Sequence, residues 1–521
     1  MRRLLVSALV LLSLSVLTGI GVAGAAVILG TIGPDELIGT ARADRLNARA
    51  GSDRLLISGD GRVDRVRCGP GRDIVNADLF DEVAADCEVV SRQLSRDPFR
   101  NFDAQHETQV EPDTFAYGST MVATFQSGRF ASGATSIGWA TSRDAGRSWR
   151  SGHLPQLTLF SKPPGGLDRV SDPVVAYDAV HRYWLISSLG VSARFSDIVV
   201  SRSRNGVSWS MPVTVAHSQV DDYDKEWVVC DNWPRSRFRG RCYLTYMNFT
   251  GELMETRMSR DGGATWSEPT AVTVSRPTAV INGVQPVVRP DGSLVVVFAV
   301  FGALQTSTNE IAAIRSTDGG TTFSPPARVA PLEEVQVSGM RAPPLPSVEV
   351  ARNGTVYVAW SDCRFSDECT ADIALARSRD GLTWAEPDRV PIGAVGAPVN
   401  RFLPGLALDA TTSGAKTRIA VLYHTLKTPV GCDPVFMCLS GVDVGLIVSR
   451  DAGKTWLRPQ RLNAQTIPLQ WIADGGNGRF LGDYVSTSWV RGRPVPVFAL
   501  ASAPSGGLLH QGMFASTRVT P

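Results

Sequence analysis

The stretch Ser142-Arg-Asp-Ala-Gly-Arg-Ser-Trp149 is the first of six related octets that decide the fold of this chain. Asp, Asn and Ser side chains bond turn backbone, glycine accepts a positive φ, and the final aromatic residue can pack between sheets. We therefore interpret each octet as a hairpin that supports the fold, and assign no catalytic residue to it. The other copies, two of them one residue short and one ending in Phe, lie at residues 203–209, 259–266, 316–323, 378–384 and 449–456.

The spacing of the octets indicates a repeated sheet. They recur at intervals of roughly sixty residues, about the length of one four-stranded sheet in a closed ring. Short β-rich runs precede each octet, for example residues 173–177, 183–189 and 197–201 before the second copy. The predicted unit is therefore three strands, an octet and one further strand.

The C-terminal tail adds a unit without an octet. Residues 484–489, 495–501 and 513–519 are predicted to form three strands, which brings the count to seven units. Its fourth strand could come from residues 99–102, and that pairing would close the ring between the two ends of the chain.

The octets resemble the Asp box, or bacterial neuraminidase repeat, of the sialidase superfamily. The resemblance implies an all-β chain with a β-propeller over residues 96–521, with seven blades favoured and six possible. Sialidases have six blades, so a seventh unit departs from the family. It also implies that the octets lie away from the central site.

Residues at the starts of the innermost strands can converge on one ligand at the centre of a propeller. Sialidases use arginines for the substrate carboxylate, a Tyr activated by Glu as nucleophile, and an Asp as acid/base. The family's early Phe/Tyr-Arg-Ile-Pro motif is absent, so its arginine triad is not carried over. The alternative for each carboxylate is a cap on a turn. Placement and resemblance together nominate Tyr484, Glu226, Asp172 and Asp222 as catalytic residues, and Arg341, Arg401, Glu111 and Asp483 as substrate-binding residues.

A second repeat precedes the octets. An Asp followed two positions later by Leu or Val recurs with a period close to nine between residues 33 and 83. It resembles the RTX nonapeptide repeat, which implies a small β-roll over residues 26–95 whose Asp oxygens share Ca²⁺ between turns. The alternative is a vestigial roll, stapled by Cys68 and Cys87, in which the carboxylates cap turns. The possible calcium ligands are Asp35, Asp44, Asp53, Asp64 and Asp73, with Asp81 continuing the series.

The N-terminus and the cysteines point to export. Residues 1–25 have the charged, apolar and small-residue regions of a signal peptide, although an uncleaved anchor is the alternative. Oxidising compartments permit disulfides, and the eight cysteines fall into couples that each close a short loop. These couples are Cys68 with Cys87, Cys230 with Cys242, Cys363 with Cys369, and Cys432 with Cys438.

Two functions remain open. The first is a secreted or cell-envelope protein of sialidase type, an exo-acting glycoside hydrolase on sialylated or other surface glycans. The second is a non-catalytic propeller that binds carbohydrate or protein, with the roll as a calcium-dependent spacer. A net charge of +2 argues against nucleic acid as a partner, and the sequence holds no G-x-S-x-G, Walker, H-E-x-x-H or dinucleotide motif. We expect a monomer with no membrane span after cleavage and no cofactor in the propeller.

Overall fold

The computed structural model describes residues 25–192, 195–273, 279–302, 309–334, 336–427 and 441–519. Nearly all of the predicted signal peptide lies outside these residues, as do Cys432 and Cys438. Apart from two 3₁₀ turns, Gly414–Lys416 and Leu469–Trp471, every described element is a strand, which confirms the all-β prediction. Within the described part of the chain no helix has the length and apolar character needed to cross a membrane.

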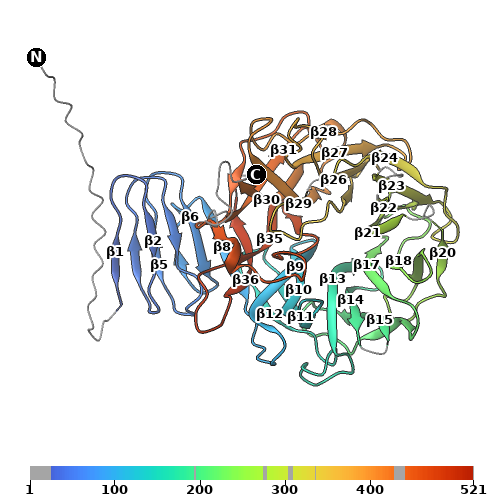
Figure 1. Ribbon diagram of the computed structural model, residues 1–521, viewed down its shortest axis with the longest axis horizontal. Helices are drawn as coiled ribbons and strands as arrows, with labels where there is room; N and C mark the ends of the chain where they lie inside the picture. The colour runs from blue at the N-terminus through green and yellow to red at the C-terminus, as the bar shows by residue number, and fades with distance from the viewer. Residues whose placement is uncertain are drawn as a thin grey trace, which may run out of the picture.

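The N-terminal repeats form a two-sheet parallel β-solenoid (Figure 1). Successive nine-residue repeats alternate between its sheets, so the inward Leu and Val side chains of Leu46, Leu55, Val66 and Val75 meet in a buried core. One sheet contains β1 (Val27–Leu29), β3 (Arg45–Asn47), β5 (Arg65–Arg67) and β7 (Glu82–Val83). The other contains β2 (Glu36–Ile38), β4 (Arg54–Leu56), β6 (Ile74–Asp78) and β8 (Val89–Ser95).

The repeat aspartates bond the coils of the solenoid to one another. Oδ1 of Asp53 accepts the backbone N–H of Asp35 at 2.8 Å, and Oδ1 of Asp73 accepts that of Asp53 at 2.8 Å. Asp64 does the same for Asp44 at 2.6 Å on the other side. Each carboxylate thus satisfies a backbone donor one coil earlier, as the turn-capping alternative expects.

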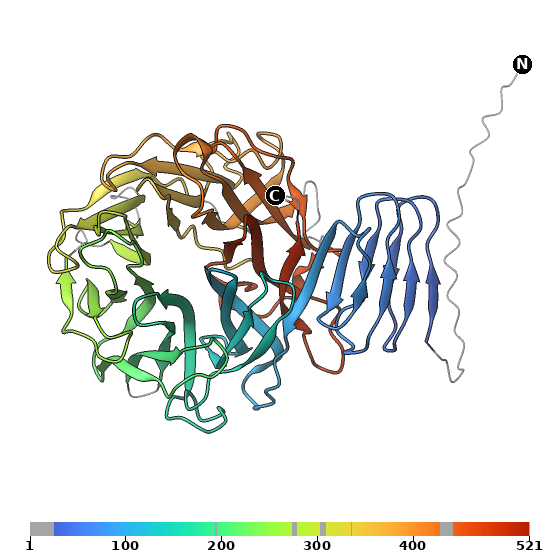
Figure 2. The ribbon, with the colours of Figure 1, turned by 180° about the vertical axis from the view of Figure 1, so that it is seen from behind.

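The rest of the described chain forms seven four-stranded antiparallel units arranged in a ring (Figures 1 and 2). The first three are β9 (Gln105–Tyr117), β10 (Thr120–Arg129), β11 (Ala134–Ser142) and β12 (Arg150–His153); β13 (Arg169–Asp178), β14 (Tyr183–Val191), β15 (Ser196–Ser203) and β16 (Val213–Ser218); and β17 (Tyr223–Cys230), β18 (Cys242–Asn248), β19 (Leu253–Ser259) and β20 (Thr270–Val272).

The next two units are β21 (Val280–Val288), β22 (Leu294–Phe301), β23 (Glu310–Ser316) and β24 (Ala327–Pro331), then β25 (Ser347–Val350), β26 (Val356–Asp362), β27 (Asp372–Ser378) and β28 (Asp388–Arg389). The sixth is β29 (Val399–Leu408), β30 (Ile419–Lys427), β31 (Gly441–Ser449) and β32 (Gln460–Arg461), with β33 (Ile467–Pro468) also paired to β31. The seventh contains β34 (Ser486–Val490), β35 (Arg493–Ala501), β36 (Gln511–Arg518) and the shared strand β8.

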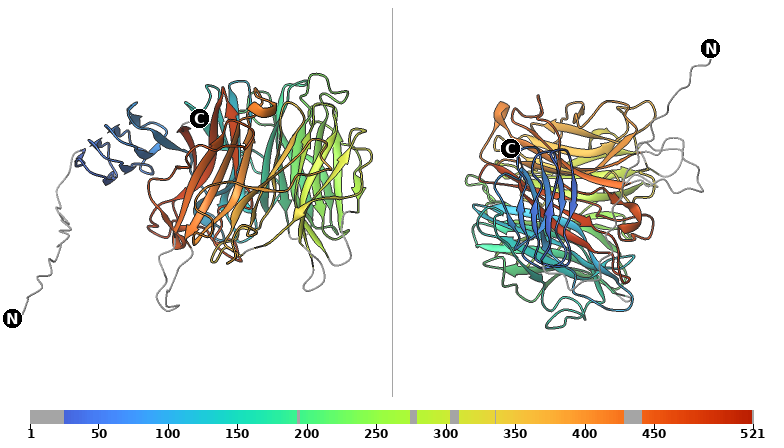
Figure 3. Two further views of the ribbon diagram at one scale, coloured as in Figure 1. Left: turned by 90° about the horizontal axis from the view of Figure 1, so that it is seen from above. Right: turned by 90° about the vertical axis from the view of Figure 1, so that its left-hand side faces the viewer.

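The innermost strands contact one another in cyclic order, and β34 returns to β9. The strand that completes the seventh unit is β8, which pairs antiparallel with β36, for example at Ser95 opposite Met513. The expectation that residues 99–102 would supply this strand is wrong, because they form no strand. Since β8 also pairs in parallel with β6, one strand joins the solenoid to the ring. The side views in Figure 3 show the solenoid extending from one side of the ring.

All six octets occupy the same corner of their units, the turn between the third and fourth strands. In the third unit, Ser259 Oγ accepts the N–H of Gly263 at 2.8 Å, and Oδ1 of Asp261 accepts that of Thr265 at 3.0 Å. Gly263 has φ +78°, and a Cβ there would lie 2.9 Å from the side chain of Leu185 in the preceding unit. Only glycine permits this close packing between units.

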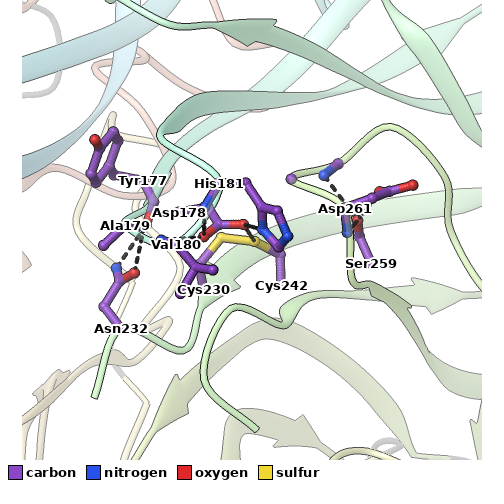
Figure 4. The surroundings of a disulfide bond; sticks show 12 residues. Tyr177, Asp178, Ala179, Val180, His181, Cys230, Asn232, Cys242, Ser259 and Asp261 are labelled. Atoms are coloured by element: carbon purple, nitrogen blue, oxygen red, sulfur yellow. Dashed lines mark hydrogen bonds and ion pairs between the residues drawn. A yellow bond between two sulfur atoms is a disulfide. The ribbon is translucent and has the colours of Figure 1, made fainter. Parts of the chain in front are cut away.

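Three of the four expected disulfides are confirmed: Cys68–Cys87, Cys230–Cys242 and Cys363–Cys369. Figure 4 shows the second, which ties the end of β17 to the start of β18. The carboxylate of Asp178 lies beside this bond and contacts Nδ1 of His181 at 2.6 Å. The fourth expected pair lies outside the described residues.

Candidate functional site

The site begins with a backbone irregularity that three neighbouring units share. The innermost strands β9, β13 and β17 each carry a bulge near the start, where pairing with the second strand shifts. Glu111, Asp172 and Lys225 stand at these bulges with φ of 57°, 48° and 52°. A left-handed conformation is costly for residues with a side chain, and bulges often redirect a side chain next to a functional site. The same shift occurs in β21 and β29, at Gly283 and Leu403, so the charged side chains at the bulges are what distinguish the first three units.

The side chains of these residues meet around one ammonium group. Nζ of Lys225 lies 3.2 Å from Glu111, 3.4 Å from Asp172 and 3.6 Å from Asp483, all carboxylate oxygens. Burial alone would lower the pKa of Lys225, but the surrounding carboxylates outweigh it and raise that pKa. Lys225 is therefore charged. Burial, opposed by Lys225, raises the pKa of Glu111 to about 7.

Asp172 and Asp224 form a hydrogen-bonded carboxyl pair beside the ammonium group. Burial and the charge of Asp172 raise the pKa of Asp224 well above its ordinary value. Burial opposes ionisation of Asp172 as well, but Lys225 and the bond from Asp224 outweigh it and lower the pKa of Asp172. Asp172 therefore ionises more readily than Asp224.

Two arginines flank the cluster. The guanidinium group of Arg341 makes a two-pronged contact with Asp483, at 3.1 Å from Nε and 2.5 Å from Nη2, and its side chain is 29% exposed. Arg129 is buried and donates to Gln126 at 2.7 Å, and Gln126 in turn donates to Glu111. The expected anion-binding group Arg341 is therefore in the cluster, but a carboxylate of the chain already occupies its fork.

Tyr484 and Glu226 do not form the expected nucleophile pair. The hydroxyl of Tyr484 donates to the carbonyl oxygen of Pro173 at 3.0 Å, and its ring lies 4.4 Å from Nζ of Lys225. Burial and nearby carboxylates raise the pKa of Tyr484, which disfavours the phenolate. Both oxygens of Glu226 are buried without a hydrogen-bond partner among the described residues, and burial raises the pKa of Glu226.

Two further expected residues lie elsewhere. Arg401 pairs with Asp372 at 3.5 Å and is buried, whereas Arg341 pairs with Asp483, so the two arginines serve different carboxylates. Asp222 is exposed and lines a cavity of about 380 Å³ together with Asp224. The strand starts and loops of the second and third units surround this cavity.

The expected residues Glu111, Asp172, Asp483, Arg341 and Tyr484 are therefore brought together. Sequence reasoning did not select Lys225, Asp224, Gln126 or Arg129. Lys225 and Asp224 lie in the same strand start as Glu226. The alternation of side chains between the two faces of a strand does not by itself show which of the three points to the centre of the ring. The bulge shifts the register there, and only the folded strand shows which side chain faces the centre.

No family model matches the chain, and no curated protein matches it either. Among solved structures, the chain is similar to a Penicillium chrysogenum α-L-arabinanase complexed with arabinobiose, with 14% identity over 66% of this chain and 94% of that one and a TM-score of 0.45. A PL25 ulvan lyase shows 10% identity over 79% and 93%, with a TM-score of 0.48. A Hadza microbial sialidase shows 16% identity over 79% and 66%, with a TM-score of 0.38. Similarities this low carry no argument about function, which depends on the residues of this chain.

Proposed function

We propose that the ring is a seven-bladed β-propeller of a secreted, carbohydrate-active enzyme, sialidase-like in architecture, that hydrolyses glycosidic bonds in surface glycans. The observation that carries the proposal is Asp224, a carboxyl with a raised pKa that lines the cavity between the second and third units. A general acid in glycoside hydrolysis needs these two properties, a proton at neutral pH and access to the leaving oxygen.

Asp222, the other expected carboxyl in the cavity, takes the second role in this proposal. Asp224 gives its proton to the glycosidic oxygen as the bond to the anomeric carbon breaks, and Asp222 accepts a proton from the water that attacks that carbon. Asp172 accepts the hydrogen bond of Asp224, and Lys225 contacts Asp172, so these two residues hold the acid in place. They are positioning residues.

The test is turnover of chromogenic glycosides, including sialosides, and release of reducing ends from surface polysaccharides. We expect Asp224→Asn to lower kcat by about 10²–10⁴-fold, the usual contribution of general acid catalysis. Asp388→Asn, an exposed carboxylate on the outermost strand β28, is the matched control and should have no effect. Equal turnover by the Asp224 variant would overturn the assignment.

The second candidate is a ring that binds glycan without cleaving it. Two observations favour this alternative: the ammonium group of Lys225 is already contacted by three carboxylates, and the hydroxyl of Tyr484 donates to the carbonyl oxygen of Pro173. Glycan binding that saturates, with no product from any glycoside and with loss of binding in the Asp224 variant, would establish it. The same preparation serves both measurements, so the two candidates are distinguished directly.

We also propose that the solenoid is a spacer domain that binds Ca²⁺. Oδ2 of Asp53, Asp64 and Asp73 is buried without a partner among the described residues, and such oxygens suit a hard cation. No group of three or more acidic, His or Cys side chains that could hold a metal occurs in the described chain, so backbone carbonyl oxygens would have to complete the site. Calcium titration by calorimetry tests this, and a titration without heat, matched by an unchanged melting temperature, would refute it.

A further inference from the structure

Ser505, His510 and Glu107 form a hydrogen-bonded relay outside the Lys225 cluster. Oγ of Ser505 is 2.6 Å from Nε2 of His510, and Nδ1 of the same ring contacts Oε2 of Glu107. With the proton on Nδ1, His510 donates to Glu107 and accepts from the serine hydroxyl. This order of serine, imidazole and carboxylate is the arrangement that activates a serine nucleophile, and it is recognised by geometry, not by position in sequence.

The relay is held in place by the surrounding backbone. Ser505 and His510 belong to the loop between β35 and β36, while Glu107 is at the start of β9. The N–H of Leu509 donates to the carbonyl of His106 at 3.2 Å and so fixes the loop to that strand. Arg100 contacts the second oxygen of Glu107 at 3.0 Å. Glu107 and His510 also have positive φ, 54° and 49°, a costly conformation that recurs where side chains are positioned for function.

All three relay residues line a cavity of about 530 Å³ between the solenoid and the ring. Apolar side chains form part of its wall, including Leu500, Ile467 and Phe514. Ser505 is exposed, so a substrate can reach its hydroxyl. Two glycines follow it, and a Cβ at either would meet nothing within 4 Å, which leaves open space beside the backbone. A volume of this size is typical of small-molecule sites.

We propose that this cavity is a second hydrolytic site, in which Ser505 and His510 are catalytic residues for carboxylic esters with a small apolar acyl group. Oγ of Ser505 attacks the ester carbonyl carbon and its proton passes to Nε2 of His510. The imidazolium returns the proton to the departing alcohol, leaving an acyl-serine. Water then attacks the acyl carbon, His510 takes its proton, and the acid leaves as Ser505 recovers a proton. Glu107 is a positioning residue that holds the imidazole.

This site is independent of the proposed glycan chemistry. The G-x-S-x-G motif places its serine on a sharp strand-to-helix turn, whereas Ser505 precedes a two-glycine turn. The absence of that motif from the sequence therefore does not bear on this site. Its residues share no hydrogen bond with Asp224 or Lys225 that the structure records. Loss of either activity therefore leaves the other testable.

The experiment treats the full chain with a fluorophosphonate probe and follows p-nitrophenyl butyrate hydrolysis. We expect labelling on the peptide that contains Ser505, and a loss of at least about 10³-fold in labelling rate and hydrolysis in Ser505→Ala and His510→Ala. Ser413→Ala is the matched control, because this exposed serine before the 3₁₀ turn Gly414–Lys416 is outside the cavity and should keep full activity.

Glu107 has its own readout. Glu107→Gln should slow labelling, and Glu107→Asp, which keeps the carboxylate, should restore part of the rate. A chain that is not labelled, or is labelled equally after Ser505→Ala, overturns the proposal. Labelling at Ser505 that persists unchanged in His510→Ala shows a serine that reacts without the relay, and this result also overturns it.

Discussion

Nζ of Lys225 lies 3.2 Å from Oε1 of Glu111, and both residues hold left-handed backbone at bulges on the first and third units of the ring. The same ammonium group contacts Asp172 on the second unit and Asp483 beside the seventh. One ammonium group thus contacts carboxylates from three other parts of the ring. Removing it leaves Glu111 and Asp172 buried without their ammonium partner, which costs far more than losing an exposed ion pair.

Replacing Lys225 is therefore expected to destabilise the ring. Lys225→Met should lower the free energy of unfolding by about 3–5 kcal/mol, the usual cost of breaking a buried pair. Denaturant unfolding measures this. Lys454→Met, at an exposed lysine in the last octet, should change it by less than about 0.5 kcal/mol. A Lys225 variant as stable as the control would show that the carboxylates are neutral without it.

Strand β8 leads to a prediction about ring closure. Deleting residues 26–88 should leave a folded, monomeric ring, because β8 still covers the edge of β36. Deleting residues 26–96 should expose that edge together with the apolar partners of Val89 and Leu94, and so produce aggregation. Size-exclusion chromatography with light scattering compares the two. Monomers from both deletions would contradict the role given to β8.

The solenoid should be more stable in mild acid than in base. Burial, opposed by backbone hydrogen bonds and reinforced by neighbouring aspartates, raises the pKa of Asp81 to about 7 and of Asp64 and Asp73 to about 6. Acids with a raised folded-state pKa stabilise a fold fully below their unfolded pKa and lose that contribution as pH rises through the folded value. In calcium-free buffer, amide exchange in the solenoid should therefore quicken between pH 5 and pH 8.

Asp81→Asn is the variant that tests this dependence, since an amide cannot titrate. We expect a flatter pH profile for the solenoid amides in this variant, whereas Asp388→Asn in the ring should leave the wild-type profile in place. Slower exchange at higher pH, after correction for the intrinsic rate, would contradict the sign of the effect.

The octets should stabilise the ring with the opposite pH dependence. Several bonds to Asp318, from Thr322, Ser316 and Thr321, outweigh the effect of burial and lower its pKa to about 2. The contribution is present above the unfolded pKa of about 3.9 and is lost as pH falls toward 2. Asp318→Ala should cost about 1 kcal/mol at pH 7, and Glu268→Ala, at an exposed residue, should cost little. Thermal unfolding at pH 7 and pH 3 measures the difference, which should shrink at the lower pH.

The local parts of the fold could be predicted from the sequence. The octets, the strand runs between them and the nearby cysteine couples are set by short-range turn chemistry and loop closure, so residues such as Asp261 and Cys230 were placed correctly. The closing strand could not be found in this way. Val89–Ser95 has the pattern of the solenoid, and its second partner, β36, lies at the other end of the chain.

The candidate sites were partly predictable. Glu111 and Asp172 each precede a proline at a strand start, which drew attention to them, and both are at the centre. Lys225 and Asp224 depend on a register shift that alternation does not encode. The contact between His510 and Glu107 joins segments some four hundred residues apart, and Ser505 bonds the same imidazole. No local sequence motif indicates this arrangement.

Because β8 is hydrogen-bonded to both β6 and β36, a continuous sheet and not a flexible hinge joins the solenoid to the ring. A protein tethered through such an arm would present its ring at a fixed angle to the anchoring surface. Force applied to the solenoid would act on all the hydrogen bonds between β8 and β36 at once, with no flexible linker to absorb it. Orientation and mechanical load would therefore reach the ring directly through a single shared strand.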